Sequence, residues 1–367
     1  MRYKIKDVAK INERAINKKY NGTINYIDTS SVTDNIFNNP KVYSSIKEAP
    51  SRARRVANLG DTIISTVRPN MKHTGFIDKV KYKNCIYSTG FAVVTPLKDR
   101  VDPFYLYLVL TNNKNTELLQ NIGETSTSTY PSVKPSDIEN LEHDFPSINE
   151  QKEISTTIKM LENKIYLNNK INTNLLAIAK EKYQKMLASS LLTKTKLKDF
   201  ATITMGQSPS SKTYNKEKQG VALLNGATDF RNGIHPSKWT TDPKKVVNKG
   251  AYIFGVRATI GLTTKVFNKY AIGRGTGSAV SKDTTNDEFL YFVLNDMFKD
   301  FKNTGSGSVY INISKKDLNE YTFYKPKINE LISFHQTIAP IMNKIYTNNQ
   351  ENIVLTEIKE NLLKQFF

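Results

Sequence analysis

The chain has 367 residues, with 53 Lys and Arg against 34 Asp and Glu, so its formal net charge is +19. This length favours two domains, and the positive excess favours nucleic acid or another anionic surface as the partner. The single cysteine, Cys85, excludes a disulfide framework and a cysteine zinc cluster, and no stretch approaches 18 consecutive apolar residues. We therefore expect a cytoplasmic protein that does not span a membrane.

The sequence repeats itself in order. Residues Lys4–Ile11 return as Lys196–Ile203, and Pro146–Glu150 returns as Pro326–Glu330, with further matches in the same order between them. A period this long excludes a solenoid and indicates a duplicated unit. The offset between matches falls from 192 to 180 along the unit and then stays constant. The first part of each unit therefore tolerates changes in length, whereas the last part does not.

Each unit begins with a region that predicts both strands and helices. Residues 61–67 and 251–256 are rich in β-branched and aromatic residues and lie beside glycines, which predicts strands. Residues 104–110 and 289–298 are mostly apolar and predict short buried helices. These patterns divide the chain into two globular domains, 1–145 and 193–325, and two helical segments, 146–192 and 326–367.

The helical segments carry a heptad pattern in which seam positions step by four and three residues without a break, which predicts a coiled coil. The seam positions are Ile154, Ile158, Leu161, Ile165, Asn168, Asn172, Leu175, Ala179, Lys182 and Met186, and then Phe334, Ile338, Ile341, Ile345, Asn348, Asn352, Leu355, Lys359, Leu362 and Phe366. One helix alone would expose its seam, so we expect the two to pair. Asparagine at a seam costs stability but fixes the register. An antiparallel pair would place Asn168 near Asn352 and Asn172 near Asn348.

Basic residues gather at matching places in the two units. Ten Lys and Arg stand against three acidic residues between Lys41 and Lys83, and eleven against four between Lys194 and Lys249. Arginine is more informative than lysine, because an AT-rich genome raises the lysine content of its proteins. In addition, the guanidinium group can form two parallel hydrogen bonds to a guanine edge or a phosphate. Polar loop residues add uncharged hydrogen-bonding groups. For any single lysine, a solvated surface remains the alternative. The predicted DNA-binding residues are Arg52, Arg54, Arg55, Arg68, Lys72, Ser126, Ser128, Tyr130, Gln207, Ser208, Lys212, Arg231, Lys244, Arg257, Arg274, Ser306, Ser308 and Tyr310.

Motifs for catalysis are weak. Asp102–Tyr105 resembles the tetrapeptide with which amino-methyltransferases hold a base, but it lacks the second proline, so a turn into a helix is favoured. Glu357–Lys359 has a nuclease spacing but lies in the heptad helix. Gly273–Gly277 predicts a tight turn, with a backbone contact to DNA as the alternative. The four histidines lack metal-ligand spacing. We expect no catalytic residue, metal or cofactor in this chain.

Several motifs together resemble the specificity subunit of type I restriction-modification systems. A strand-forming Gly-Asp-x-Ile-Ile-Ser spans Gly60–Ser65, and Pro-x-x-x-Glu-Gln-x-x-Ile, from Pro146 to Ile154, opens the first long helix. The second copy departs from this pattern, with Leu331 in place of Gln151 and Gly250-Ala251 in place of Gly60-Asp61. Each motif alone is loose, but their duplicated order covers essentially the whole chain.

The resemblance implies an α+β fold, with two similar mixed α/β target recognition domains separated by a long antiparallel two-helix coiled coil, as a pseudo-two-fold internal repeat. Each domain would read one half of a split site in double-stranded DNA, and the coiled coil would set the spacer. The implied partners are two methyltransferase subunits, which would carry S-adenosylmethionine, and restriction/translocase subunits. The alternatives are a stand-alone or fused DNA-modifying enzyme and a coiled-coil adaptor protein.

Overall fold

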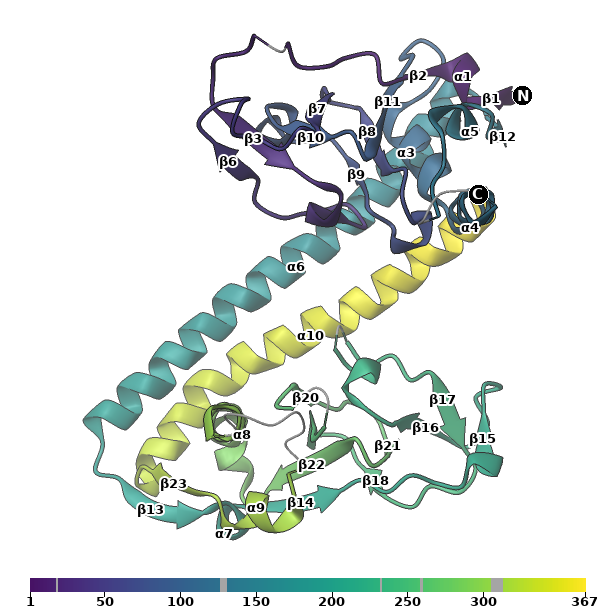
Figure 1. The fold of residues 1–367 in the computed structure, drawn as a ribbon. Coiled ribbons are helices and arrows are strands. Elements are labelled where there is room, and N and C mark those ends of the chain that lie inside the picture. The colour runs from purple at the N-terminus through teal and green to yellow at the C-terminus, as the bar shows by residue number, and fades with distance from the viewer. Residues whose placement is uncertain (18, 126–130, 232, 258–259, 305–312) are drawn as a thin grey trace. The chain divides into compact units, whose positions relative to one another are not determined.

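The computed structural model describes residues 1–17, 19–125, 131–231, 233–257, 260–304 and 313–367. The chain forms two compact units (Figure 1). The first consists of Met1–Asn163 with Glu357–Phe367, and the second of Lys164–Thr356. Both combine strands and helices, so the expected mixed α/β class is confirmed. Among the described residues, no helix combines the length and the apolarity that a membrane crossing requires.

The first unit is built on two four-stranded sheets. One has the order β2-β11-β8-β9, and the other has the order β6-β3-β10-β7 with a parallel β3–β10 pair. The expected strand at 61–67 is β8. Two smaller pairs join β1 with β12 and β4 with β5. The strand bounds are β1 Arg2–Lys4, β2 Ala9–Ile11, β3 Ile24–Ile27, β4 Val32–Thr33, β5 Ile36–Phe37, β6 Lys41–Tyr43, β7 Ala53–Val56, β8 Thr62–Ser65, β9 Thr74–Phe76, β10 Ile86–Ser88, β11 Phe91–Pro96 and β12 Glu142–Asp144.

The central helix of the first unit is α3, Pro103–Thr111, and every residue from Phe104 to Leu110 is buried. Asp102 begins the helix, because its carboxylate accepts hydrogen bonds from the backbone N–H groups of Phe104 and Tyr105 at 3.1 and 2.9 Å. The predicted turn into a short buried helix is therefore confirmed. The other helices are α1 Ile5–Val8, α2 Val80–Lys83, α4 Asn113–Glu124 and α5 Pro135–Glu139, with 3₁₀ turns η1 Thr29–Ser31 and η2 Pro69–Met71.

The second unit repeats the same sheet plan. Its four-stranded sheet has the order β14-β22-β19-β20, and its five-stranded sheet adds β15 to the order β17-β16-β21-β18, again with one parallel pair, β16–β21. The expected strand at 251–256 is β19. The strand bounds are β13 Thr193–Lys196, β14 Ala201–Met205, β15 Tyr214–Asn215, β16 Val221–Leu224, β17 Lys238–Thr240, β18 Val246–Val247, β19 Tyr252–Gly255, β20 Thr263–Lys265, β21 Tyr270–Ile272, β22 Thr276–Ser281 and β23 Thr322–Lys325, which pairs with β13.

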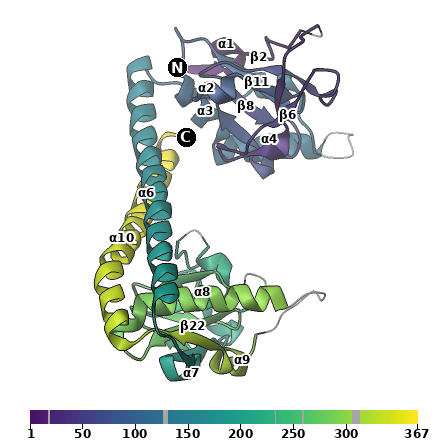
Figure 2. The same ribbon diagram turned by 90° about the vertical axis from the view of Figure 1, so that its left-hand side faces the viewer.

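Helix α8, Asp287–Thr304, lies over the sheet that contains β22 (Figure 2). Its Phe289, Leu290 and Phe298 are fully buried, and the ring of Phe298 lies 5.0 Å from that of Phe254 on β19. The apolar run at 289–298 therefore forms the buried helix that the sequence predicted. The remaining short helices of this unit are α7 Leu197–Phe200 and α9 Lys315–Glu320, with 3₁₀ turns η3 Ser211–Thr213, η4 Ala227–Asp229 and η5 Thr284–Asn286.

Two long helices, α6 (Ile148–Ser189) and α10 (Ile328–Phe366), run through both units. In the second unit, Asn168 Nδ2 donates to Asn352 Oδ1 at 2.9 Å, and Asn348 Nδ2 donates to Asn172 Oδ1 at 2.8 Å. These are the two contacts that the heptad pattern predicted, and they occur only if the helices run antiparallel there. One seam position was wrong: Lys182 is exposed, and the neighbouring Tyr183 is buried in its place.

The end of α10 and Phe367, which follows it, pack on the core of the first unit. The ring of Phe367 lies 5.2 Å from that of Tyr105 on α3 and stacks at 5.8 Å on His143 of β12. The start of α6 is tied to the same helix α3, because the buried Gln151 accepts a hydrogen bond from the backbone N–H of Asp102 at 2.9 Å. The Glu-Gln motif of the sequence therefore links a long helix to the core of its own unit.

Candidate nucleic-acid interface

In the second unit, three loop segments meet at one end of the four-stranded sheet. They are Gly206–Ser208 after β14, Asn225–Gly226 after β16 and Gly273–Gly275 between β21 and β22, which together we call the glycine junction. Backbone hydrogen bonds join the segments: Gln207 N–H donates to Ile272 at 3.0 Å, and Gly275 N–H donates to Asn225 at 3.2 Å. The ends of two sheets are thereby joined by main-chain hydrogen bonds.

Glycine is required at this junction because the backbones approach too closely for a side chain. A Cβ atom on Gly206 would lie 2.1 Å from the carbonyl oxygen of Gly273, and one on Gly275 would lie 2.6 Å from that of Asn225. Thr276 N–H donates to Gly273 at 3.0 Å, which closes the expected tight turn. The glycine run of the sequence is therefore explained by packing, and a contact with DNA is not needed to account for it.

The glycine junction carries polar side chains at its surface. Ser208 Oγ donates to Asn225 Oδ1 at 3.3 Å and accepts from the N–H of Arg274 at 3.2 Å. The side chains of Gln207 and Arg274 are exposed. Val256 N–H donates to Gly275 at 3.1 Å, which brings the exposed Arg257 next to the same site. The structure thus gathers four of the predicted residues, Gln207, Ser208, Arg257 and Arg274.

Asn225 also lies at this surface, and sequence reasoning missed it. The only local signal was an Asn-Gly pair, which is common in turns. Its backbone N–H donates to the buried carboxylate of Asp229 at 2.8 Å, so the loop that carries it is fixed from below. Its side chain is exposed.

The other predicted residues of the second unit lie on separate segments. Lys212 is exposed in η3, and Arg231 is exposed in the loop between β16 and β17. Lys244 is exposed and forms an ion pair with Asp242 at 2.6 Å. Among the described residues, no hydrogen bond or ion pair joins these three side chains to the glycine junction.

In the first unit, the corresponding end of the sheet lies at the turn of Thr89 and Gly90. Thr89 N–H donates to the carbonyl of Arg52, and Thr66 N–H donates to that of Gly90, both at 2.8 Å. Arg52 and Arg68 are exposed, and Arg68 adopts a left-handed backbone with φ of 50° just beyond Thr66. The predicted pair Arg52 and Arg68 is therefore brought to one end of the sheet. Lys72 lies further along, where Nζ donates to Asn113 Oδ1 at 3.0 Å.

The densest basic cluster of the sequence is divided by the fold. Arg54 and Arg55 lie on β7 and are half-buried, whereas Arg52 precedes the strand and is exposed. Arg54 Nη1 donates to the carbonyl of Ala53 at 2.9 Å. Burial lowers the pKa of the Arg55 guanidinium, whose Nε has no hydrogen-bond partner among the described residues. The difference follows the start of the strand, because Arg52 lies before β7 and the other two arginines lie on it.

Six predicted residues lie outside the described residues: Ser126, Ser128, Tyr130, Ser306, Ser308 and Tyr310. Among the residues that are described, no three His, Cys, Asp or Glu side chains are grouped so as to hold a metal ion. Glu357 and Lys359 lie on α10, where Lys359 contacts Glu162 at 3.4 Å, so the nuclease-like spacing is a helix surface. His335 contacts the buried Glu288 at 2.5 Å, which ties α10 to α8.

Two units of one sheet plan, each with exposed polar and basic residues at one end of a sheet, define a duplicated protein of two similar mixed α/β domains. The chain belongs to the family described as type I restriction modification DNA specificity domain, which matches residues 1–177 and 191–360. The two matched segments correspond to the two copies of the repeat.

Curated relatives carry the same description. The MjaX type I restriction enzyme specificity subunit of Methanocaldococcus jannaschii is 25% identical over an alignment of 329 positions, which covers 83% of this chain and 77% of that protein. The HindI type I restriction enzyme specificity subunit of Haemophilus influenzae is 23% identical over 98% of this chain and 97% of its own length. A solved structure of the type I restriction-modification system S subunit from M. genitalium matches with a TM-score of 0.66 at 15% identity, over 100% of this chain and 96% of that one, which shows a common fold.

Proposed function

We propose that this chain is the DNA specificity subunit of a type I restriction-modification complex and that each mixed α/β domain reads one half of a bipartite DNA site. The observation that carries the proposal is the duplication itself: two matched family segments coincide with two copies of one sheet plan. The target recognition domains are residues 1–145 and 193–325. The helical segments are residues 146–192 and 326–367, and they contain α6 and α10.

The paired helices act as the spacer between the two half-sites. Their proposed register rests on a polar layer in the second unit, in which Asn168 bonds to Asn352 and Asn348 bonds to Asn172. Asn352 Nδ2 in turn donates to Asn169 at 2.9 Å, and Asn172 Nδ2 donates to Asn349 at 2.8 Å. The two copies of the repeat are offset by 180 residues, and the bond from Asn168 to Asn352 has its equivalent in the bond from Asn348 to Asn172. A slip by one heptad would leave most of these amides opposite apolar side chains, so the layer favours one register.

The chain itself catalyses no reaction in this proposal. Methylation would come from two methyltransferase subunits that carry S-adenosylmethionine, and cleavage from restriction/translocase subunits. This assignment is supported by the names of the relatives, which are specificity subunits of restriction enzymes.

Arg274 is proposed to contact a DNA phosphate or a guanine edge beside the glycine junction. Replacing Arg274 with Ala should lower the slope of log binding constant against log salt concentration by about 1, because one fewer counterion is released. The control is Lys198→Ala, which removes the same charge from α7, at the opposite end of β14. Binding of the assembled complex to its site is measured from low to moderate salt. Equal slopes for the two variants would show that Arg274 does not contact the DNA.

The proposal as a whole is tested by reconstitution. The chain is combined with its methyltransferase partners, and genomic DNA from cells expressing the complex is sequenced for methylated adenine. We expect a single bipartite sequence with two defined halves and a spacer of fixed length. The proposal would be contradicted if methylation were confined to a continuous site. It would also be contradicted if an active methyltransferase methylated no site in the presence of this chain.

A further inference from the structure

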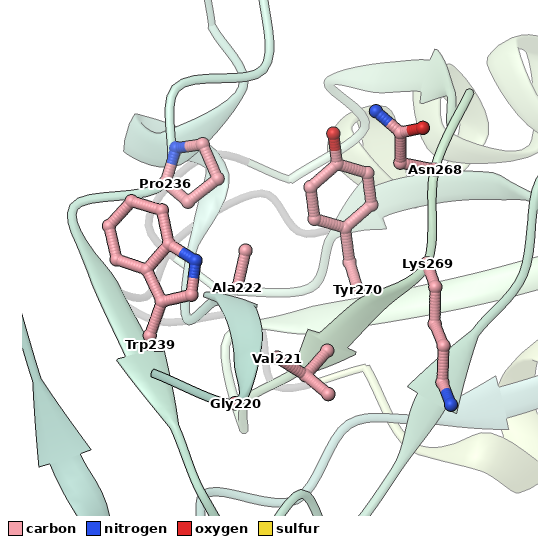
Figure 3. A pocket seen from close by; sticks show the side chains of 8 residues that line it. All are labelled: Gly220, Val221, Ala222, Pro236, Trp239, Asn268, Lys269 and Tyr270. Atoms are coloured by element: carbon pink, nitrogen blue, oxygen red, sulfur yellow. The ribbon is translucent and has the colours of Figure 1, made fainter. Parts of the chain in front are cut away.

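A cavity of about 410 Å³ opens on the five-stranded sheet of the second unit, away from the glycine junction (Figure 3). It is lined by Val221 and Ala222 of β16, Trp239 of β17, Tyr270 of β21, and the loop residues Gly220, Pro236, Asn268 and Lys269. Trp239 is the single tryptophan of the chain. The proposed function so far assigns nothing to this cavity.

The sheet register explains how the cavity forms. Trp239 on β17 lies directly opposite Ala222 on β16. On the other side, β16 and β21 are parallel and Leu223 lies opposite Ala271, so the preceding residues, Ala222 and Tyr270, are also neighbours. Neighbours across strands point to one face of the sheet, so a methyl group lies between two large aromatic side chains. Two strand spacings separate the aromatic residues by about 10 Å. Figure 3 shows the rings of Trp239 and Tyr270 rising on either side of Ala222. We call this row, Trp239–Ala222–Tyr270, the aromatic slot.

The first unit has no such slot in the corresponding row. In its sheet, Asn25 on β3 lies opposite Val42 on β6. Strands β3 and β10 are parallel and Tyr26 lies opposite Ile86, so the preceding residues, Asn25 and Cys85, are also neighbours. The row Val42–Asn25–Cys85 occupies the same place in a sheet of the same strand order, yet it carries no aromatic ring. The slot is therefore a property of the second unit and not of the fold.

The surroundings of the slot suit an anionic ligand with a planar ring. The ammonium group of Lys218 lies 5.9 Å from the centre of the Trp239 ring, and Lys269 lines the cavity. The strands that carry Ala222 and Tyr270 end at the glycine junction, at Asn225 and Gly273. From Tyr270 to Gly273 is three residues, about 10 Å of strand. A DNA strand at the junction would therefore be within reach of the slot.

We propose that the aromatic slot binds one unstacked nucleobase of the DNA, stacked on Trp239 and bordered by Tyr270, while Lys218 neutralises an adjoining phosphate. This inference rests on the proposed DNA-binding function and adds a second kind of contact to it. A base stacks about 3.4 Å from an aromatic ring, so the space above Ala222, between strands about 10 Å apart, admits one base on the face of Trp239. Aromatic side chains hold bases in this way irrespective of base identity. The second half of the site would thus be distorted, and the first would not.

The test uses the full chain assembled with its methyltransferase subunits. The bipartite site is first identified by methylome sequencing. DNA duplexes are then made that carry 5-iodouracil at successive positions of the second half-site and its flanks. The adenine that the methyltransferase itself extrudes is left unmodified. We expect photocrosslinking from one position, mapped by mass spectrometry to Trp239 or Tyr270. Ala222→Leu fills the slot and should abolish the crosslink and weaken binding by about tenfold.

Two controls make the result decisive. Asn25→Leu enlarges the corresponding residue of the first unit and should change nothing, and Trp239→Leu removes one wall without filling the slot and should also abolish the crosslink. If the wild-type complex methylates its bipartite site but no position crosslinks to the slot, the inference is wrong while the proposed function stands. Protection of Trp239 from chemical oxidation by the methyltransferase subunits without DNA would identify a protein occupant, and would also overturn it. Failure to methylate any bipartite site would instead count against the proposed function.

Discussion

Removing one heptad from each long helix is expected to shorten the recognised spacer by about three base pairs and to leave both half-sites unchanged. Seven residues of helix span about 10.5 Å, and one base pair spans about 3.4 Å. The structure decides which residues to remove. Asn168 pairs with Asn352, and Glu162 contacts Lys359, so Leu161–Leu167 lies opposite Ile353–Lys359. Deleting these two segments together keeps the asparagine layer and the heptad phase.

A matched control removes the same number of residues in a different combination. The internal repeat alone would suggest deleting Leu161–Leu167 with its repeat counterpart, Ile341–Thr347. With the pairing of both helix ends retained, this change would place Asn172 opposite Leu355 and break the asparagine layer. We expect the first deletion to give a complex with a shorter spacer and the second to give poor assembly or mixed spacing. Methylome sequencing reads the spacer directly. An unchanged spacer after the first deletion would refute the role of the helices as a ruler.

Replacing Gly206 with Ala is expected to disable reading of the second half-site while sparing the first. The new Cβ would lie 2.1 Å from the carbonyl oxygen of Gly273 and 2.6 Å from that of Thr276, and both are backbone atoms that no side-chain rotation can move. Relieving the overlap must separate the segment that carries Gln207 from the segment that carries Arg274. Overpacking of this kind costs roughly 1–3 kcal/mol of stability.

Gly226→Ala is the matched control for this prediction. Gly226 lies in the same glycine junction, but a Cβ there would meet nothing within 4 Å, and its backbone is not in the left-handed region. Its unfolding free energy should stay within about 0.5 kcal/mol of the wild type. Thermal unfolding and the methylated sequence are measured for both variants. Equal behaviour of the two would show that close packing at the junction does not matter for reading.

Much of the fold follows from patterns that can be read locally. The strands β8 and β19 and the buried helices α3 and α8 are where apolar runs predicted them, because each run is long enough to fill one element. The asparagine contacts followed from the heptad step. The step fails at Lys182, because the end of α6 packs on the core of the second unit, including α8, as well as on α10. There Tyr183 stacks on Phe292 at 4.8 Å and donates to Asp296 at 2.9 Å.

The candidate interface was less accessible from the sequence, because it depends on which segments meet. Gln207, Arg257 and Arg274 were predicted singly from their chemistry, and the fold brings them together. Asn225 was missed because its role depends on Ser208 and Gly275, which are distant in sequence. The aromatic slot requires the strand order β17-β16-β21, which separates Trp239 from Tyr270 by one strand and which no local pattern specifies. Composition could not tell the exposed Arg52 from the half-buried Arg55.

The packing of Phe367 against Tyr105 bears on the order in which the protein is made. The first unit is interrupted, since Met1–Asn163 needs Glu357–Phe367 to complete its core, whereas the second unit is one continuous stretch. Domains usually mature during synthesis from the N-terminus onward. Here the ribosome must pass residue 367 before the domain translated first can close, and the domain translated second can be finished earlier. Until then Tyr105 and His143 lack their contacts with the ring of Phe367, so translation of residues 357–367 sets the time at which the first unit is completed.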